Sequence, residues 1–196
     1  MMNRNIPGEI ILDKITKHFG EKQILRGYSA ALKAGNIYCL MAPSGGGKTT
    51  LLRIIAGLDR EYGGKMEGLS ECTVSMQFQE DRLLDHLSAA DNIRFVLPGA
   101  SAADIEKALS AVGLSGTDSQ PVREYSGGMR RRVSLVRALL YPADLYLLDE
   151  PFTGLDEEAR GCAIRFLKER TRGRTVLLTT HREKDAADCG ASILRI

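Results

Sequence analysis

A glycine-rich run that ends in Lys-Thr-Thr is the part of this sequence best suited to hold a phosphate group. Residues 42–50 read APSGGGKTT, after an apolar strand predicted at 37–41 and before a helix predicted at 50–56. Backbone N–H groups in such a turn point at one spot, where the helix N-terminus adds partial positive charge. Lys48 can then reach the outer phosphates of a nucleoside triphosphate, and the Thr49 hydroxyl can bind Mg²⁺.

The sequence therefore predicts that the whole run contacts a nucleoside triphosphate. The predicted contact residues are Ala42, Pro43, Ser44, Gly45, Gly46, Gly47, Lys48, Thr49 and Thr50. Ala42 departs from the usual phosphate-binding loop, which opens with glycine. A glycine-rich surface turn is the alternative interpretation, and the strand–loop–helix context with an intact Gly-Lys-Thr argues against it.

An acidic pair follows a second apolar strand, predicted at 145–148. The carboxyl ends of parallel strands meet at one edge of a sheet, so we expect Asp149 and Glu150 beside the phosphate-binding loop. Asp149 can hold Mg²⁺ through water, and Glu150 can polarise an attacking water as a general base. An acidic turn without a function is the alternative, and it fits the pair taken alone.

The composition fits one α/β domain with a full core. The chain has 196 residues and a net charge of +2, which is too mild to indicate nucleic-acid or anionic-membrane binding. Four cysteines form no Cys-x-x-Cys pair and three histidines lie far apart, so we expect a reducing cytosol and no zinc site. The first residues lack the apolar core of a signal peptide, and no stretch is suited to cross a bilayer. We therefore expect another chain to hold the protein wherever it acts at a membrane.

The order of the predicted elements indicates an α/β fold. Short apolar segments separated by turns are typical of an antiparallel β part, and strands alternating with helices predict a mainly parallel sheet with helices on both faces. The predicted parts of the single domain 1–196 are an antiparallel β part at about 1–35, a core at 36–82, a helical lobe at 83–140 and further core at 141–196. The remaining predicted elements are a strand at 71–78, helical structure at 83–114, a polar loop at 115–125, a helix carrying Met129, Val133, Val136 and Leu140 on one face, a helix at 157–168 and a strand at 175–179.

Taken in order, the motifs resemble those of ABC-type ATPases from about Phe19 to Asp188. The shared order is a phosphate-binding loop, a Gln after a strand, Ser-Gly-Gly at a helix start, an apolar strand with Asp-Glu, Gly-Leu-Asp, and a His that ends a strand. The resemblance implies a P-loop NTPase core with an inserted helical part. It also implies two ATP molecules held between two head-to-tail subunits, so that a monomer does not complete a site.

A Tyr-Ser-Gly-Gly-Met run resembles the family signature Leu-Ser-Gly-Gly-Gln. Ser126 is a good helix N-cap, and Gly127 and Gly128 let N–H groups approach an anion. In the family this helix start faces the γ-phosphate of ATP on the opposite subunit, whereas a plain helix cap is the alternative for the motif alone. Tyr125 and Met129 depart from the pattern, and the loss of the Gln contact implies a lower turnover or dimer affinity.

Four further positions carry the resemblance. Gln79 matches the family's Q-loop, whose Gln reaches Mg²⁺ or the attacking water, and an exposed loop Gln is the alternative. Asp156 matches the D-loop, which meets the other subunit, and it could also cap the next helix. His181 resembles the switch His that contacts the γ-phosphate, and Phe19 aligns with the aromatic that stacks on adenine, with a core Phe as its alternative.

The resemblance implies the ATP-hydrolysing subunit of an ABC transporter. ATP would bring two copies together, and hydrolysis would separate them and drive separate permease subunits. Residues 78–84, with Asp91, Asn92 and Ile93 soon after, resemble ATPases of nitrate, sulfonate and taurine importers. This implies an extracytoplasmic solute-binding protein as a further partner and a position on the cytoplasmic face of the membrane.

Two other functions are weighed against transport. A soluble ABC-type ATPase that acts on DNA or ribosomes usually carries coiled-coil or zinc insertions or a second nucleotide domain, and the sequence has none of these. A small-molecule kinase explains the phosphate-binding loop but neither the Ser-Gly-Gly motif nor His181. The three arginines at 130–132 are interpreted as a solvated helix face because no aromatic residues are interleaved, so no nucleic-acid partner is expected.

Overall fold

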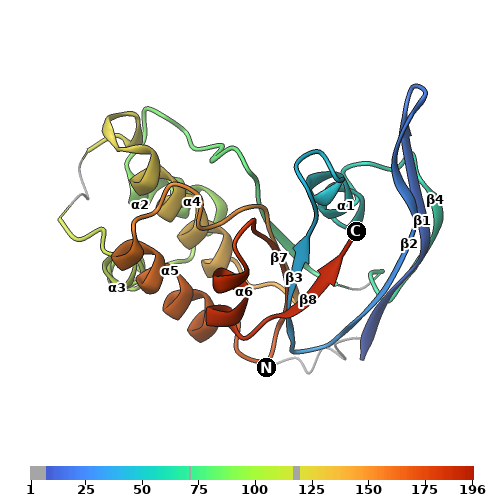
Figure 1. Cartoon of the computed structure of the whole chain (residues 1–196). Helices are drawn as coiled ribbons and strands as arrows, with labels where there is room; N and C mark the ends of the chain where they lie inside the picture. The colour runs from blue at the N-terminus through green and yellow to red at the C-terminus, as the bar shows by residue number, and fades with distance from the viewer. Residues whose placement is uncertain (1–7, 71, 117–119) are drawn as a thin grey trace.

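Two β-sheets and the helices packed on them make up the computed structural model, which describes residues 8–70, 72–116 and 120–196 (Figure 1). A parallel sheet has the strand order β5-β6-β7-β3-β8, and an antiparallel sheet has the order β2-β1-β4. The strands are β1 Glu9–Phe19, β2 Lys22–Lys33, β3 Ile37–Met41, β4 Gly63–Glu67, β5 Val74–Gln77, β6 Leu145–Leu148, β7 Thr175–Thr179 and β8 Ser192–Arg195. Residues 1–7, for which the sequence predicts no signal peptide, lie outside the described residues. Residue 71 of the strand predicted at 71–78 and residues 117–119 of the polar loop predicted at 115–125 also lie outside them.

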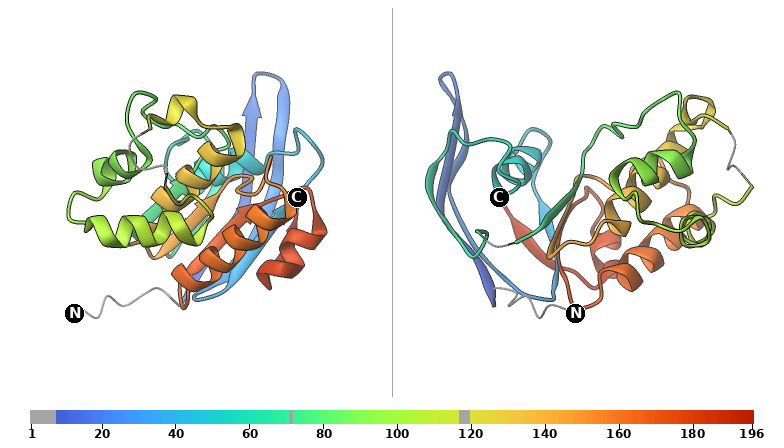
Figure 2. Two further views of the ribbon diagram at one scale, coloured as in Figure 1. Left: turned by 90° about the vertical axis from the view of Figure 1, so that its left-hand side faces the viewer. Right: turned by 180° about the vertical axis from the view of Figure 1, so that it is seen from behind.

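Side chains of the parallel sheet alternate between two hydrophobic clusters, one on each face. Tyr38 and Leu40 of β3 belong to the cluster that contains α1 and the antiparallel sheet, whereas Cys39 and Met41 belong to the cluster with the other helices. The helices are α1 Lys48–Ile55, α2 Ala89–Val96, α3 Ala102–Ala111, the 3₁₀ turn η1 Val122–Glu124, α4 Gly127–Leu140, α5 Glu157–Arg170 and α6 Glu183–Cys189. The predicted α/β fold with helices on both faces is therefore confirmed (Figure 2).

The central strands bring three loops to one edge of the parallel sheet. Strands β6 and β7 are buried along their whole length, as strands covered on both faces require. Leu40 of β3 pairs with Thr179 of β7, and Leu148 of β6 pairs with Leu178. The loops that follow these strands therefore leave the sheet side by side.

The amino-terminal strands are longer than the sequence predicts. Instead of several short segments, β1 and β2 are continuous strands of 11 and 12 residues. The register shifts between Leu12 and Ile15, where Lys14 has a φ angle of 51°, so the apolar residues do not alternate regularly. Strands β4 and β8 are not predicted, because most of their residues are exposed at sheet edges and carry little apolar signal.

The predicted helical region at 83–114 contains two short helices, α2 and α3, after an irregular segment. Residues of α2, α3, α4 and α5 share one hydrophobic cluster with the parallel sheet. Among the described residues, no helix has both the length and the apolar character needed to cross a bilayer. Burial raises the pKa of Cys39 to about 11 and that of Cys189 to about 12, so both thiols stay protonated at neutral pH.

Candidate functional site

The phosphate-binding loop connects β3 to α1 in a shape that glycine permits. Gly45 and Gly47 have φ angles of 74° and 90°, in the left-handed region that glycine adopts without strain. A Cβ on Gly47 would lie 2.8 Å from Cδ2 of Leu25, so the loop rests directly against β2. Gly47 is also the N-cap of α1, and within this fully described segment no acidic residue occupies the first helical turn. The first N–H groups of α1 are therefore well placed to bind an anion.

The side chain of Lys48 folds back over the loop. Its Nζ donates a hydrogen bond to the carbonyl oxygen of Ala42 at 3.0 Å, and the residue is only 7% exposed. Because Ala42 takes part through its main chain, alanine in place of glycine keeps this contact. The methyl group of Ala42 leaves no room for a side chain at position 46, because a Cβ on Gly46 would lie 2.8 Å from Cβ of Ala42. Position 46 therefore has to be glycine.

One cavity of about 190 Å³ gathers predicted site residues from distant parts of the sequence. It is lined by Ile24, Ser44, Gly45, Gly46, Gly47, Lys48, Thr49, Thr50, Gln79, Glu150 and His181. A second cavity, of about 430 Å³, shares Thr49 and Gln79 with the first and adds Asp149. Ala42 and Pro43 line another hollow together with His181. The loops that follow β3, β5, β6 and β7 thus converge on one region, as the parallel sheet requires.

Glu150 is held by two side chains and by a rare backbone conformation. Its Oε1 lies 2.7 Å from Nε2 of His181, and its Oε2 accepts a hydrogen bond from Oγ1 of Thr153 at 3.1 Å. Its φ angle of 50° is in the left-handed region that side chains disfavour, at a cost of about 1–3 kcal/mol. The N–H of Glu150 donates to Oγ1 of Thr179 at 2.8 Å, which helps to hold this conformation. Glu150 therefore lines the cavity in a fixed position with His181 beside it.

Asp149 has one paired and one unpaired carboxylate oxygen. The residue is 1% exposed, and its Oδ1 accepts a hydrogen bond from Oγ1 of Thr179 at 2.8 Å. Its Oδ2 is buried and has no hydrogen-bond partner among the described residues. With the Thr49 hydroxyl and the Gln79 amide at the same cavity, this oxygen forms a set of hard ligands that fits Mg²⁺, which would neutralise charge on bound phosphates. The described residues contain no cluster of three or more His, Cys, Asp or Glu that could hold a metal ion.

The predicted contact residues at the start of α4 do not line either cavity. Ser126 is the N-cap of α4 and accepts a hydrogen bond from the N–H of Met129 at 3.2 Å. A Cβ on Gly128 would lie 3.1 Å from the carbonyl oxygen of Gly154. The start of α4 therefore packs against the loop that precedes α5, and Ser126 and Gly127 are exposed there.

Phe19 and Asp156 also lie outside these cavities. Phe19 ends β1 and is 55% exposed, with Nζ of Lys17 at 5.0 Å from the centre of its ring, so the alternative of a core Phe is wrong. Asp156 is the N-cap of α5 and accepts a hydrogen bond from the N–H of Ala159 at 2.8 Å, so the alternative role as a helix cap is confirmed. The exposed ring of Phe19 leaves a face to stack on a base.

A comparison with protein families agrees with this geometry. The model of the family described as ABC transporter matches residues 25–153. The chain belongs to the ABC transporter family. The matched segment of this ABC transporter chain contains the phosphate-binding loop, the Q-loop, the signature and the acidic pair.

Curated relatives of this ABC transporter chain are import ATP-binding proteins. Sulfate/thiosulfate import ATP-binding protein CysA of Neisseria meningitidis serogroup A is 35% identical over 206 residues, covering 94% of this chain and 58% of the relative. CysA of Mesorhizobium japonicum is 37% identical over 202 residues, covering 92% of this chain and 58% of the relative. Aliphatic sulfonates import ATP-binding protein SsuB of Pseudomonas fluorescens is 37% identical over 202 residues, covering 98% of this chain and 74% of the relative. The chain thus spans 58% of the length of these CysA relatives, and the predicted resemblance to the sulfonate importer group is confirmed.

The two residues that depart from the ABC signature pack in apolar surroundings. Tyr125 is 6% exposed and belongs to the hydrophobic cluster on the helical face of the sheet. Met129 is partly buried and packs against the same cluster. The N–H of Met129 donates a hydrogen bond to Oγ of Ser126. This contact uses the main chain of Met129, so it does not depend on Met standing in place of Gln.

The three arginines near the start of α4 do not form a solvated helix face, and that prediction is wrong. Arg130 pairs with Asp85 at 2.7 Å. Arg132 donates to the carbonyl oxygens of Val112 and Gly113 at 2.8 and 3.0 Å. Guanidinium groups have several donors in one plane, which suits carbonyl groups of irregular segments that lack partners of their own.

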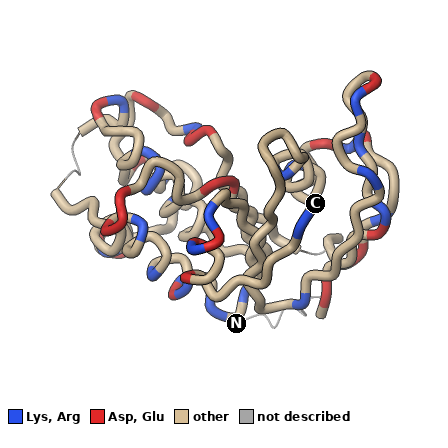
Figure 3. Tube along the Cα trace, viewed as in Figure 1, with Lys and Arg blue, Asp and Glu red and all other residues tan. Residues whose placement is uncertain are grey.

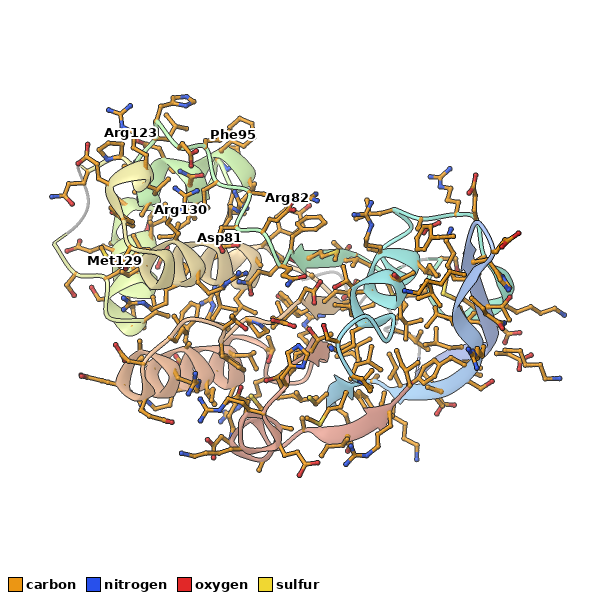
Figure 4. The ribbon with its side chains drawn as sticks, turned by 45° about the horizontal axis from the view of Figure 1, so that its top comes forward. Asp81, Arg82, Phe95, Arg123, Met129 and Arg130 are labelled. Carbon is orange, nitrogen blue, oxygen red and sulfur yellow. The ribbon has the colours of Figure 1, made fainter. Side chains whose placement is uncertain are left out.

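Two arginines of α4 hold the Q-loop, residues 78–82, by its main chain. Asp81 and Arg82 of this loop are labelled in Figure 4. Arg131 donates to the carbonyl oxygens of residues 78 and 79, and Arg137 donates to those of residues 81 and 82. Arg131 also lies 3.3 Å from Oδ1 of Asp81, a carboxyl whose pKa is raised by burial although the neighbouring arginines favour its charged form. The sequence gives no signal for these contacts, because they join segments more than 50 residues apart.

Replacing Arg131 with Met should loosen the Q-loop. The substitution keeps the apolar stem but removes charge-assisted hydrogen bonds, each worth about 1.5–3 kcal/mol. We expect amide hydrogen exchange across residues 78–82 to become about tenfold faster or more in mass-spectrometric measurements. Arg172→Met, at an exposed position outside this loop, is the matched control and should leave the exchange unchanged. Equal exchange in the Arg131 variant and the wild type would show that α4 does not hold the loop.

Proposed function

We propose that this chain binds and hydrolyses ATP. The observation that carries the proposal is the cavity of about 190 Å³, in which the phosphate-binding loop meets Gln79, Glu150 and His181. Lys48 and the first N–H groups of α1 would hold the triphosphate. Asp149 and two other oxygen ligands at the neighbouring cavity would hold Mg²⁺.

Hydrolysis would use Glu150 as the general base. Its carboxylate would take a proton from a water whose oxygen attacks the γ-phosphorus, and ADP would leave. Oε1 of Glu150 lies 2.7 Å from Nε2 of His181. A γ-phosphate would compete for His181, so ATP binding itself would free Glu150 to accept a water.

The proposal includes a second copy of the chain. Ser126, Gly127 and Gly128 do not line the cavity of their own chain, and they lie at the start of a 14-residue helix. The first N–H groups of a helix and its dipole favour an anion. A head-to-tail pair would bring this helix start, and the loop containing Asp156, towards ATP bound to the other copy. Each site would then need both copies.

We further propose that ATP hydrolysis by this chain drives import. The relatives are by name import ATP-binding proteins for sulfate and thiosulfate or for aliphatic sulfonates, which share a sulfur oxyanion. The chain would work on the cytoplasmic face of the membrane with permease subunits and an extracytoplasmic solute-binding protein. Acidic and basic residues are interspersed along the trace in Figure 3, which does not favour a nucleic-acid partner.

Membrane fractionation of co-expressed proteins tests the transport proposal. Co-expressed with candidate permease subunits, the wild type should sediment with membranes, and alone it should stay in the supernatant. Its ATPase activity should need Mg²⁺ and be lost on chelation. Activity that is stimulated by DNA or ribosomes, without recruitment by a permease, would favour the soluble alternative and contradict import.

A further inference from the structure

Thr179 touches both residues of the acidic pair. It is the last residue of β7 and is fully buried. Its Oγ1 lies 2.8 Å from Oδ1 of Asp149 and 2.8 Å from the main-chain nitrogen of Glu150. A hydroxyl has one proton to donate, and an ionised carboxylate can only accept. Thr179 therefore donates to Asp149 and accepts from Glu150.

We propose that Thr179 is a positioning residue for both carboxylates during ATP hydrolysis, an inference that rests on the proposed function. The bond to Oδ1 of Asp149 fixes the rotation of that carboxylate and leaves Oδ2, which is buried and unpaired, as the free ligand. The bond from the N–H of Glu150 holds the left-handed backbone that aims the general base. One hydroxyl thus sets the relative placement of the metal-binding and the water-activating group.

The position of β7 gives Thr179 this role. Leu148 pairs with Leu178, so the next residue of each strand continues the same register, and Asp149 meets Thr179. Valine has nearly the same shape as threonine and suits a buried strand. It would fill the space but leave Oδ1 of Asp149 and the N–H of Glu150 without this partner. The hydroxyl can therefore be removed with little change in packing.

The test compares hydroxyl removal at the two ends of the same strand. In Thr179→Val we expect kcat for ATP to fall about 10–100-fold, the usual effect of removing a group that orients a ligand, with KM for ATP within about threefold of wild type. Thr179→Ser keeps the hydroxyl and should restore kcat to within about threefold. Thr175→Val is the matched control, because Thr175 is buried at the far end of β7. Among the hydrogen bonds of the described residues, its hydroxyl oxygen accepts only from the N–H of Gly35, at 3.2 Å. The kcat of Thr175→Val should equal that of the wild type.

A second readout needs no hydrolysis. Measured by NMR without nucleotide, amide exchange of Glu150 should be about tenfold faster in Thr179→Val and unchanged in Thr175→Val. If Thr179→Val does not fold, Thr179→Ala serves the same comparison. A kcat for the hydroxyl-free variant within threefold of wild type, failure of Thr179→Ser to rescue it, or unchanged exchange at Glu150 overturns the positioning role. A wild type that does not hydrolyse ATP counts instead against the proposed function, and the exchange measurement then shows separately whether Thr179 holds Glu150.

Discussion

Replacing Glu150 with Gln should slow ATP hydrolysis by about 10²–10⁴-fold and leave ATP binding intact, because an amide cannot act as a general base. Gln has nearly the same shape, so the contacts with His181 and Thr153 can be kept. Phosphate release under single-turnover conditions, with nucleotide binding measured in parallel, checks both parts. Glu158→Gln, at an exposed position in the first turn of α5, is the matched control and should hydrolyse ATP like the wild type.

The same substitution should trap a dimer. If each ATP is held between two copies, slow hydrolysis leaves the ATP-bound pair intact for longer. Size-exclusion chromatography with light scattering in saturating Mg-ATP should therefore show twice the monomer mass for Glu150→Gln. The double variant with Lys48→Ala should form less dimer at an ATP concentration that just saturates Glu150→Gln. A monomeric Glu150→Gln protein with ATP bound would contradict the composite site but not the assignment of the general base.

Replacing Lys48 with Ala should weaken ATP binding roughly 10–100-fold, the loss expected when charge-assisted hydrogen bonds to phosphate are removed. The ammonium group of Lys48 lies at the cavity, where it contacts only the carbonyl oxygen of Ala42 among the hydrogen bonds of the described residues. Titration with a fluorescent ATP analogue measures the affinity. Lys65→Ala, at an exposed position in β4, removes the same charge away from the cavity and should bind normally. Equal affinity in the Lys48 and Lys65 variants would rule out the phosphate-binding loop as the nucleotide site.

The buried parts of the fold were predictable because their signal is local. Strands β6 and β7 have the predicted bounds, since strands buried on both faces are uniformly apolar and flanked by turns. The edge strands β4 and β8 expose most of their residues, so only pairing with a neighbour defines them. The bulged β1 shows the same limit, because its register shift breaks the alternation from which a strand is recognised.

The candidate site was predictable where residue type alone indicates chemistry. A Gly-rich loop with Lys and Thr predicts phosphate binding from a few consecutive residues, and a carboxylate pair after an apolar strand predicts metal binding in the same way. Thr179 and the arginines of α4 carry no such signal, because a strand hydroxyl and a helical guanidinium are ordinary until a partner is placed beside them. The fold brings Asp149 to Thr179 from 30 residues away along the chain, and the carbonyl oxygen of Phe78 to Arg131 from 53 residues away.

The way in which α4 holds the Q-loop also bears on how this surface can change over generations. Arg131 and Arg137 bind main-chain carbonyl oxygens, and every amino acid provides one. Glu80 is exposed and pairs with Arg82 on the surface at 3.5 Å, so its side chain can be exchanged while the path of the loop is kept. Such a loop can diverge to suit different neighbours without rebuilding the helix beneath it. Two descendants of one ancestral chain could then differ in the side chains exposed here and still keep the contact between α4 and the main chain of Gln79.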